Sequence, residues 1–137
     1  MVFIRYHTRA EEVDEETFFY SRETGGTVAS TALDLMHEII QERYPPSQWN
    51  IYGSQASDGD NWYDDTPACV ERLRGDLLPV CQFFSYVEIN SHGGQDLWHY
   101  YSSLEEEFPG QFAQREIQGE ADVFQALREL FKKRTPA

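Results

Sequence analysis

The sequence predicts an α/β fold: a three-layer, doubly wound and mostly parallel sheet within a single domain that covers residues 1–137. Segments with strand and helix character alternate from residue 45 onward, which is the order that βαβ units produce. Val80–Ile89 is almost wholly apolar or aromatic, as is typical of a strand covered on both faces. A chain of this length buries about 65–70% of its unfolded surface, which is enough for one core.

The first third of the chain predicts two strands and a helix. Met1–Thr8 contains a compact apolar block and predicts a strand, and Arg9–Val13 predicts a charged edge strand that resists pairing with other chains. After Gly25-Gly26-Thr27, apolar residues recur at helical spacing until Pro45-Pro46 stops the helix.

The remaining elements alternate regularly. We expect strands at Trp49–Ala56, Val80–Ile89 and Phe112–Ile117. We expect helices from Asp65 or Thr66 to Pro79, around Leu97, Tyr101 and Leu104, and at the end of the chain, marked by Val123, Phe124, Leu127, Leu130 and Phe131. Trp49 is expected to pack into the core.

The net charge of the chain bears on which classes of partner it can bind. The formal net charge of −13 argues against nucleic acid and against an anionic membrane surface, and it favours a basic partner or a divalent cation. The alternative is that the charge only keeps the protein soluble.

Cys69 and Cys81 lack CxxC spacing and predict a buried, reduced pair. No leader or apolar run of membrane-spanning length is evident, so a cytoplasmic location is expected.

Two turns carry the side chains that could bind a ligand. Gly25 and Gly26 let the backbone approach a ligand closely, and Thr27 places a hydroxyl beside a predicted helix N-terminus. The alternative is that Thr24 or Thr27 only caps this helix. Asp58 and Asp60 follow the predicted strand Trp49–Ala56, at the end of the sheet where ligands bind in open α/β folds; the alternative is a solvated turn.

Hydroxyl and carboxylate oxygens together suit Mg²⁺ or Mn²⁺. Trp62 beside the acidic turn and His7 at the end of the first strand could add to a binding surface. The chain contains no HExxH pattern, GxSxG elbow or P-loop, so the sequence gives no support for zinc, serine-nucleophile or nucleotide chemistry.

Several segments resemble the YeaH/YhbH family of uncharacterised bacterial proteins, sometimes called sporulation protein YhbH, and through it the von Willebrand factor A fold. The segments that carry the resemblance are Val2–Thr8, Phe18–Ser21, Glu23–Thr27, Trp49–Tyr52, Gln55–Trp62, Ser85–Ile89 and Arg128–Phe131. The resemblance implies a metal-ion-dependent adhesion site in which Thr27 is the ligand from the second loop and Asp58 the ligand from the third.

The first loop of such a site, Asp-x-Ser-x-Ser, is absent from the sequence. By the resemblance, the strand and helix that carry this loop would precede Met1, so the fold would be truncated at its N-terminus and a central strand would be missing. Strands Val2–His7 and Trp49–Gln55 would each lose a ladder partner. We expect these strands either to pair directly or to have the gap filled by a second copy in a homodimer.

The function implied by the resemblance is a non-catalytic interaction or regulatory module linked to stress or sporulation signalling, with a PrkA-type serine protein kinase as partner. Without the first loop, Mg²⁺ or Mn²⁺ should bind with a Kd of about 1 mM or weaker. The alternatives are an Mg²⁺-dependent hydrolase or phosphatase, for which His7 and Asp60 are the nearby candidates, and a fold fragment without any active site.

Overall fold

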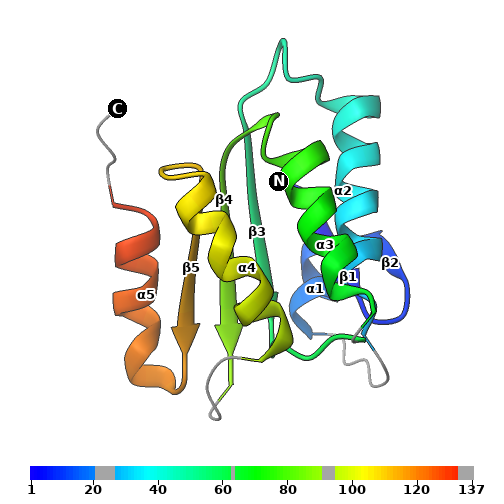
Figure 1. Cartoon of the computed structure of the whole chain (residues 1–137). Helices are drawn as coiled ribbons and strands as arrows, with labels where there is room; N and C mark the ends of the chain where they lie inside the picture. The colour runs from blue at the N-terminus through cyan, green and yellow to red at the C-terminus, as the bar shows by residue number, and fades with distance from the viewer. Residues whose placement is uncertain (21–26, 63, 91–94, 133–137) are drawn as a thin grey trace.

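The strands form two separate sheets in the computed structural model, which describes residues 1–20, 27–62, 64–90 and 95–132. β3 (Ile51–Ser57), β4 (Cys81–Ile89) and β5 (Phe112–Ile117) make a parallel sheet in the order β3-β4-β5 (Figure 1). β1 (Phe3–Tyr6) and β2 (Ala10–Val13) form an antiparallel pair of their own. The predicted parallel arrangement is therefore confirmed for three strands.

The expectation that the first strand pairs directly with the strand after Pro46 is wrong, because β1 and β3 belong to different sheets. The Tyr6 side chain connects them: its hydroxyl donates to the Ala56 carbonyl at 3.3 Å and accepts from Gln55 Nε2 at 3.2 Å. The strand after Pro46 is also only partly covered. β3 is an edge strand whose alternate residues, Tyr52 and Ser54 among them, are exposed.

The described residues include five α-helices. They are α1 (Glu15–Tyr20), α2 (Ser30–Arg43), α3 (Thr66–Arg72), α4 (Asp96–Glu107) and α5 (Val123–Leu130). α3 continues as one π-helical turn (η1, Leu73–Leu77), and a short 3₁₀ turn (η2, Glu120–Asp122) precedes α5. The predicted helix from Asp65 or Thr66 to Pro79 thus corresponds to α3 and η1 together.

The larger core lies between one face of the parallel sheet and helices α2, α3 and α4 (Figure 1). β4 contributes Phe84 and Tyr86 to it, and α4 contributes Leu97, Tyr101 and Leu104, which are fully buried as expected. β3 can approach α2 closely because Gly53 lacks a side chain: a Cβ there would lie 2.5 Å from the Phe84 ring and 2.8 Å from Met36.

A second core lies on the opposite face of the sheet and makes the third layer. Phe83 and Val87 of β4 and two residues of β5 pack there against Ala126 and Leu130 of α5. Because Phe83 and Phe84 are adjacent in the strand, they point to opposite faces. The prediction that β4 is covered on both faces is confirmed.

One prediction about burial is wrong, and one helix buries little of its apolar pattern. Trp49 is 51% exposed and stacks edge-on against Tyr44 at 5.1 Å between ring centroids, because the strand begins two residues later at Ile51. The predicted closing helix is α5, which buries Leu130 and leaves the other apolar residues of the pattern exposed: Val123, Phe124, Leu127 and Phe131. The position of α5 explains this, because it packs on one edge of the sheet and only its inner side meets the core.

Candidate functional site at the carboxyl edge of the sheet

The loop after β3 is held at several points at the carboxyl edge of the parallel sheet. The Asp58 carbonyl accepts a hydrogen bond from Asn90 Nδ2 at 3.0 Å, and the Gly59 carbonyl accepts from the Leu97 N–H at 3.4 Å. Within the loop, Asp58 Oδ1 accepts from the Asp60 N–H at 3.0 Å. These bonds fix the backbone while the side chains of Asp58 and Asp60 stay exposed.

Thr27 lies beside this loop. Its carbonyl accepts a hydrogen bond from the Trp62 N–H at 3.1 Å, so the two predicted turns are adjacent in space. Thr27 is half-buried and the Trp62 side chain is 55% exposed. The structure therefore brings Thr27, Asp58, Asp60 and Trp62 to one edge of the sheet.

Thr27 does not open the helix, contrary to the prediction, because α2 begins at Ser30. The Ala29 N–H donates to Asn61 Oδ1 at 3.0 Å, and the Ser30 N–H donates to Asp65 Oδ2 at 2.9 Å. Side chains from the loop after β3 thus occupy the N-terminus of α2 and satisfy donors that would otherwise be available to a ligand. The groups that cap α2 in these bonds are therefore the side chains of Asn61 and Asp65.

Asp65 is the centre of this connection. Besides the Ser30 N–H, its carboxylate accepts hydrogen bonds from Ser30 Oγ at 2.5 Å, Asn61 Nδ2 at 3.1 Å and Cys69 Sγ at 3.5 Å. Partial burial alone would raise the pKa of Asp65, but these hydrogen bonds outweigh it and hold the pKa below its usual value.

Glu88 lies fully buried beneath the loop, at 0% exposure, and was missed by the sequence analysis. Its Oε1 accepts from the Tyr86 hydroxyl at 2.9 Å, and its Oε2 accepts from Asn90 Nδ2 and from the Gln95 N–H, each at 3.0 Å. The sequence does carry one signal for Glu88, which is an acidic residue near the end of an apolar strand. A buried carboxylate needs hydrogen-bond donors from the protein itself, so such a residue indicates a supporting network.

Gly59 fits closely over Glu88. Its φ of +91° lies in the region that favours glycine, and a Cβ there would overlap the Glu88 carboxylate. Asn90 joins Glu88 to the Asp58 carbonyl through one amide nitrogen. The buried carboxylate therefore positions the loop that carries Asp58 and Asp60.

The remaining residues of the predicted binding surface are His7, Gly25 and Gly26. His7 follows β1, its carbonyl accepts from the Val28 N–H at 2.7 Å, and its Nδ1 lies 3.3 Å from Thr8 Oγ1. Gly25 and Gly26 fall outside the described residues.

The oxygen donors at this edge suit a divalent cation only in part. Asp58 and Asp60 supply exposed carboxylates and Thr27 a hydroxyl, which is the hard oxygen chemistry that Mg²⁺ prefers. Among the described residues no group of three or more His, Cys, Asp or Glu side chains could hold a metal ion. The donors fit an ion that keeps most of its waters, as Mg²⁺ does where one or two carboxylates bind it.

Both cysteines are buried and free, as predicted. Burial raises the pKa of Cys81 to about 11 and that of Cys69 further, so both are protonated thiols near neutral pH. Neither thiol has the exposed, electropositive surroundings that activate a nucleophile.

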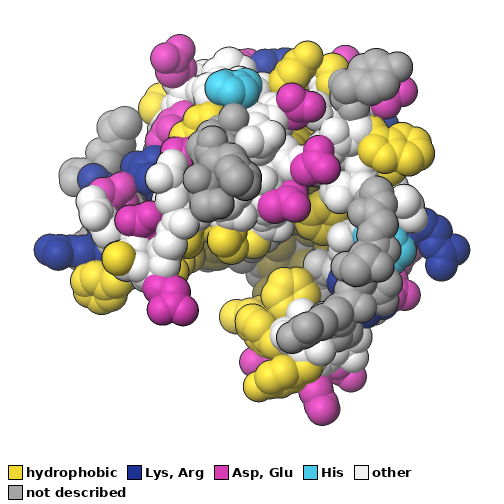
Figure 2. Space-filling view, turned by 90° about the horizontal axis from the view of Figure 1, so that it is seen from below, with side chains coloured by type: hydrophobic (Ala, Val, Ile, Leu, Met, Phe, Trp, Pro, Cys, Tyr) yellow, Lys and Arg dark blue, Asp and Glu magenta, His cyan; other side chains and the backbone are white. Residues whose placement is uncertain are grey.

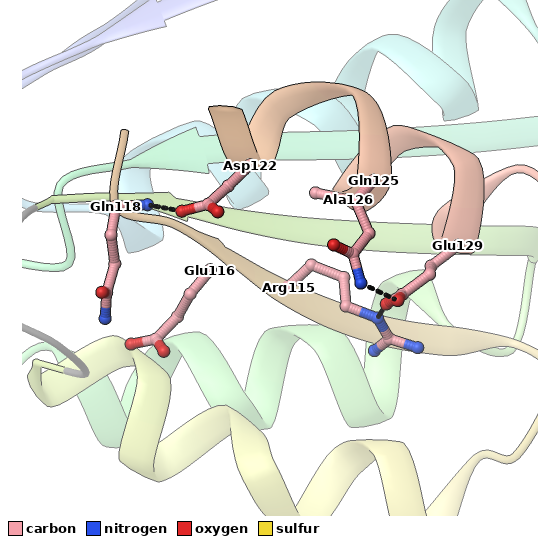
Figure 3. A pocket seen from close by; sticks show the side chains of 7 residues that line it. All are labelled: Arg115, Glu116, Gln118, Asp122, Gln125, Ala126 and Glu129. Carbon is pink, nitrogen blue, oxygen red and sulfur yellow. Dashed lines mark hydrogen bonds and ion pairs between the residues drawn. The ribbon is translucent and has the colours of Figure 1, made fainter. Parts of the chain in front are cut away.

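A polar hollow of about 240 Å³ lies between β5 and α5 (Figure 3). Arg115 is its cation, but Arg115 Nε lies 2.8 Å from Glu129 Oε2 and Nη1 lies 3.0 Å from Glu105 Oε1. With its positive charge matched by two carboxylates, the hollow offers no binding site for an anion.

None of the helices in the described ranges has both the length and the apolar character of a membrane span.

Comparison with known proteins identifies close relatives. The chain is 58% identical over 135 residues to UPF0229 protein VP0986 of Vibrio parahaemolyticus, 55% identical to a UPF0229 protein of Teredinibacter turnerae and 55% identical to one of Yersinia pestis. Each match covers 98% of this chain but 32% of the relative, so the chain spans about a third of the length of these curated relatives. No solved structure matches it.

The family described as "Protein of unknown function (DUF444)" matches residues 1–134. The resemblance to YeaH identifies this same family. The matches themselves do not show a von Willebrand factor A fold. The chain belongs to the DUF444 family, whose curated members carry the name UPF0229.

Proposed function

We propose that this chain is a non-catalytic protein-interaction module that binds its partner at the carboxyl edge of the parallel sheet. The observation that carries the proposal is the loop after β3, whose backbone is fixed by Asn90, Leu97 and Thr27 while its acidic and aromatic side chains point outward. A fixed loop loses little conformational entropy on binding. An exposed tryptophan such as Trp62 is a residue type enriched at binding hot spots.

A divalent cation would assist this interaction. Asp58 and Asp60 would hold it weakly, and a carboxylate from the partner would complete the coordination. The von Willebrand factor A resemblance supports this role, in which Thr27 and Asp58 are the ligands. The net charge of −13 also favours a cation between this surface and an acidic group of a partner.

The family resemblance makes a PrkA-type serine protein kinase the partner to test first, in stress or sporulation signalling in the cytoplasm. With the chain immobilised, we expect the purified kinase to bind in Mg²⁺ and to dissociate in EDTA. Trp62→Ala and Asp58→Asn should each weaken binding by about tenfold, because each removes a group from the fixed loop. The measurement is surface plasmon resonance.

Asp64→Asn is the matched control, because Asp64 is also exposed and lies outside the fixed part of the loop. Its binding should equal that of the unchanged chain. Kinase binding that is equal in Mg²⁺ and EDTA, or an absence of binding in both, contradicts the metal-assisted interaction. Turnover of p-nitrophenyl phosphate that is lost in Asp58→Asn would instead support the Mg²⁺-dependent hydrolase.

A further inference from the structure

The end of β1 contacts both turns of the candidate site. The His7 carbonyl accepts a hydrogen bond from the Val28 N–H at 2.7 Å, directly after Thr27. One residue earlier in the chain, the Tyr6 hydroxyl donates to the Ala56 carbonyl at 3.3 Å, near the end of β3. Tyr6 and His7 therefore hold the segment beside each turn, one through its side chain and the other through its backbone.

Three consecutive residues of β3 surround the Tyr6 hydroxyl. Besides the Ala56 carbonyl, it contacts the Gln55 side chain, whose Nε2 donates to it at 3.2 Å. Burial, the largest effect, raises the pKa of Tyr6, and hydrogen bonds with the side chains of Gln55 and Ser57 oppose it. The Ser57 hydroxyl in turn accepts from the Gly59 N–H at 2.9 Å. The contacts of Tyr6 thus continue into the loop after β3.

Backbone pairing does not set the distance between β1 and β3, because the two strands belong to separate sheets. Seen from the carboxyl edge, the part with β1, β2 and α1 projects from the rest of the molecule, and a hollow lies between it and the part with α5 (Figures 1 and 2). The Tyr6 ring bridges the two sheets by packing against the larger core. Its side chain is therefore placed to fix where the end of β3 lies relative to the Thr27 turn.

The same loop is held from another direction by Glu88. Asn90 Nδ2 donates to both the Glu88 carboxylate and the Asp58 carbonyl. Tyr6 acts two residues before Asp58, at Ala56. The backbone that carries the Asp58 side chain is therefore fixed from two directions, from the end of β1 and from the end of β4.

Tyr101 offers an internal comparison, because it also binds Gln55. Its fully buried hydroxyl donates to Gln55 Oε1 at 3.0 Å, so the Gln55 amide lies between two phenols. The bond from Tyr101 ends at a side chain, whereas Tyr6 also reaches the β3 backbone at Ala56. Removal of either hydroxyl takes one bond from the buried Gln55 amide, but removal of the Tyr6 hydroxyl also frees the end of the strand.

We propose that Tyr6 is a positioning residue for the site at the carboxyl edge: its hydroxyl fixes the end of β3 relative to the Thr27 turn, so that Asp58 and Thr27 present their oxygens to the same ligand. The effect on the loop after β3 does not depend on a ligand. The effect on binding rests on the proposed function, in which a divalent cation binds at these residues.

Amide hydrogen exchange followed by NMR tests the effect on the loop without a metal. Tyr6→Phe keeps the ring in the core and removes the hydroxyl. We expect the Gly59 and Trp62 amides then to exchange about tenfold faster relative to the Phe84 amide, which lies in the central strand and reports any general loss of stability. In Tyr101→Phe, the matched control, this ratio should stay as in the unchanged chain. An unchanged ratio in Tyr6→Phe, or an equal rise in both variants, would overturn the proposal.

A titration with Mn²⁺, followed by the EPR signal of the free ion, tests the effect on binding. The Kd should rise by about three- to tenfold in Tyr6→Phe, because Asp58 and Thr27 lose their fixed relative position, and by less than about twofold in Tyr101→Phe. A Kd that is unchanged in Tyr6→Phe, or raised equally in Tyr101→Phe, contradicts the positioning of this site. If the unchanged chain binds no Mn²⁺, the metal-assisted interaction fails, and the exchange ratios decide whether Tyr6 positions the loop.

Discussion

Replacing Glu88 by alanine lowers the free energy of unfolding by about 3 kcal/mol, because three donors in a buried site lose their acceptor. These donors are the Tyr86 hydroxyl, the Asn90 side-chain amide and the Gln95 N–H. Urea denaturation followed by tryptophan fluorescence measures the change. Because Asn90 also holds the Asp58 carbonyl, the same substitution should loosen the loop after β3.

Two companion variants make the test specific. Glu88→Gln keeps one carbonyl oxygen that can accept from both Asn90 and Gln95, so it should cost less than half as much as Glu88→Ala. Glu116→Ala removes the acid paired with Glu88 in register on β5, where the side chain is only half-buried, and should change stability by less than about 0.5 kcal/mol. A loss in Glu116→Ala equal to that in Glu88→Ala would show that the hydrogen bonds to Glu88 are not the cause.

Replacing Asp65 by alanine is expected to cost about 2–3 kcal/mol at neutral pH, because Asp65 caps α2 from a distant part of the chain. The variant removes the acceptor for the Ser30 N–H and hydroxyl and for the Asn61 amide. Asp64→Ala, at the exposed neighbouring position, should stay within about 0.5 kcal/mol of the unchanged chain. Thermal and urea unfolding measure both variants.

The pH dependence of this effect has a definite sign. The folded-state pKa of Asp65 is lower than its unfolded value of about 3.9, so its stabilising contribution is complete above that unfolded value. It is lost as the pH falls through the lower, folded-state pKa. The stability difference between the unchanged chain and Asp65→Asn should therefore be constant from about pH 5 to pH 7 and shrink below about pH 4. A difference that does not change with pH would contradict a charged Asp65 in the folded protein.

Local sequence patterns predicted the strands and helices that pack against neighbours from the same βαβ unit. Phe112–Ile117 and the apolar run ending at Ile89 became strands as expected, and Leu97, Tyr101 and Leu104 became the buried side of α4. In each case the period of the apolar residues decides both the element and the face it buries.

The sequence could not indicate contacts between distant segments. Asp65 follows Ser30 by 35 positions, so nothing local shows that it caps α2 rather than α3. β1 and β3 belong to different sheets, and Phe124 and Leu127 are exposed because α5 meets the second core through Ala126 and Leu130. For the candidate site, the adjacency of the segments that carry Thr27 and Asp58 could be predicted, whereas the supporting role of Glu88 required the structure.

The most direct test of the proposed function is a calorimetric titration of Mn²⁺ and Mg²⁺ into this chain, Asp58→Asn and Asp64→Asn. Asp58→Asn keeps the oxygen that accepts from the Asp60 N–H but removes the charge, so it changes the site without removing the turn. We predict binding with a Kd of about 1 mM in the unchanged chain and in Asp64→Asn, and none in Asp58→Asn. Equal heats in all three proteins, or no heat in any of them, would contradict a metal-assisted interaction site at this edge of the sheet.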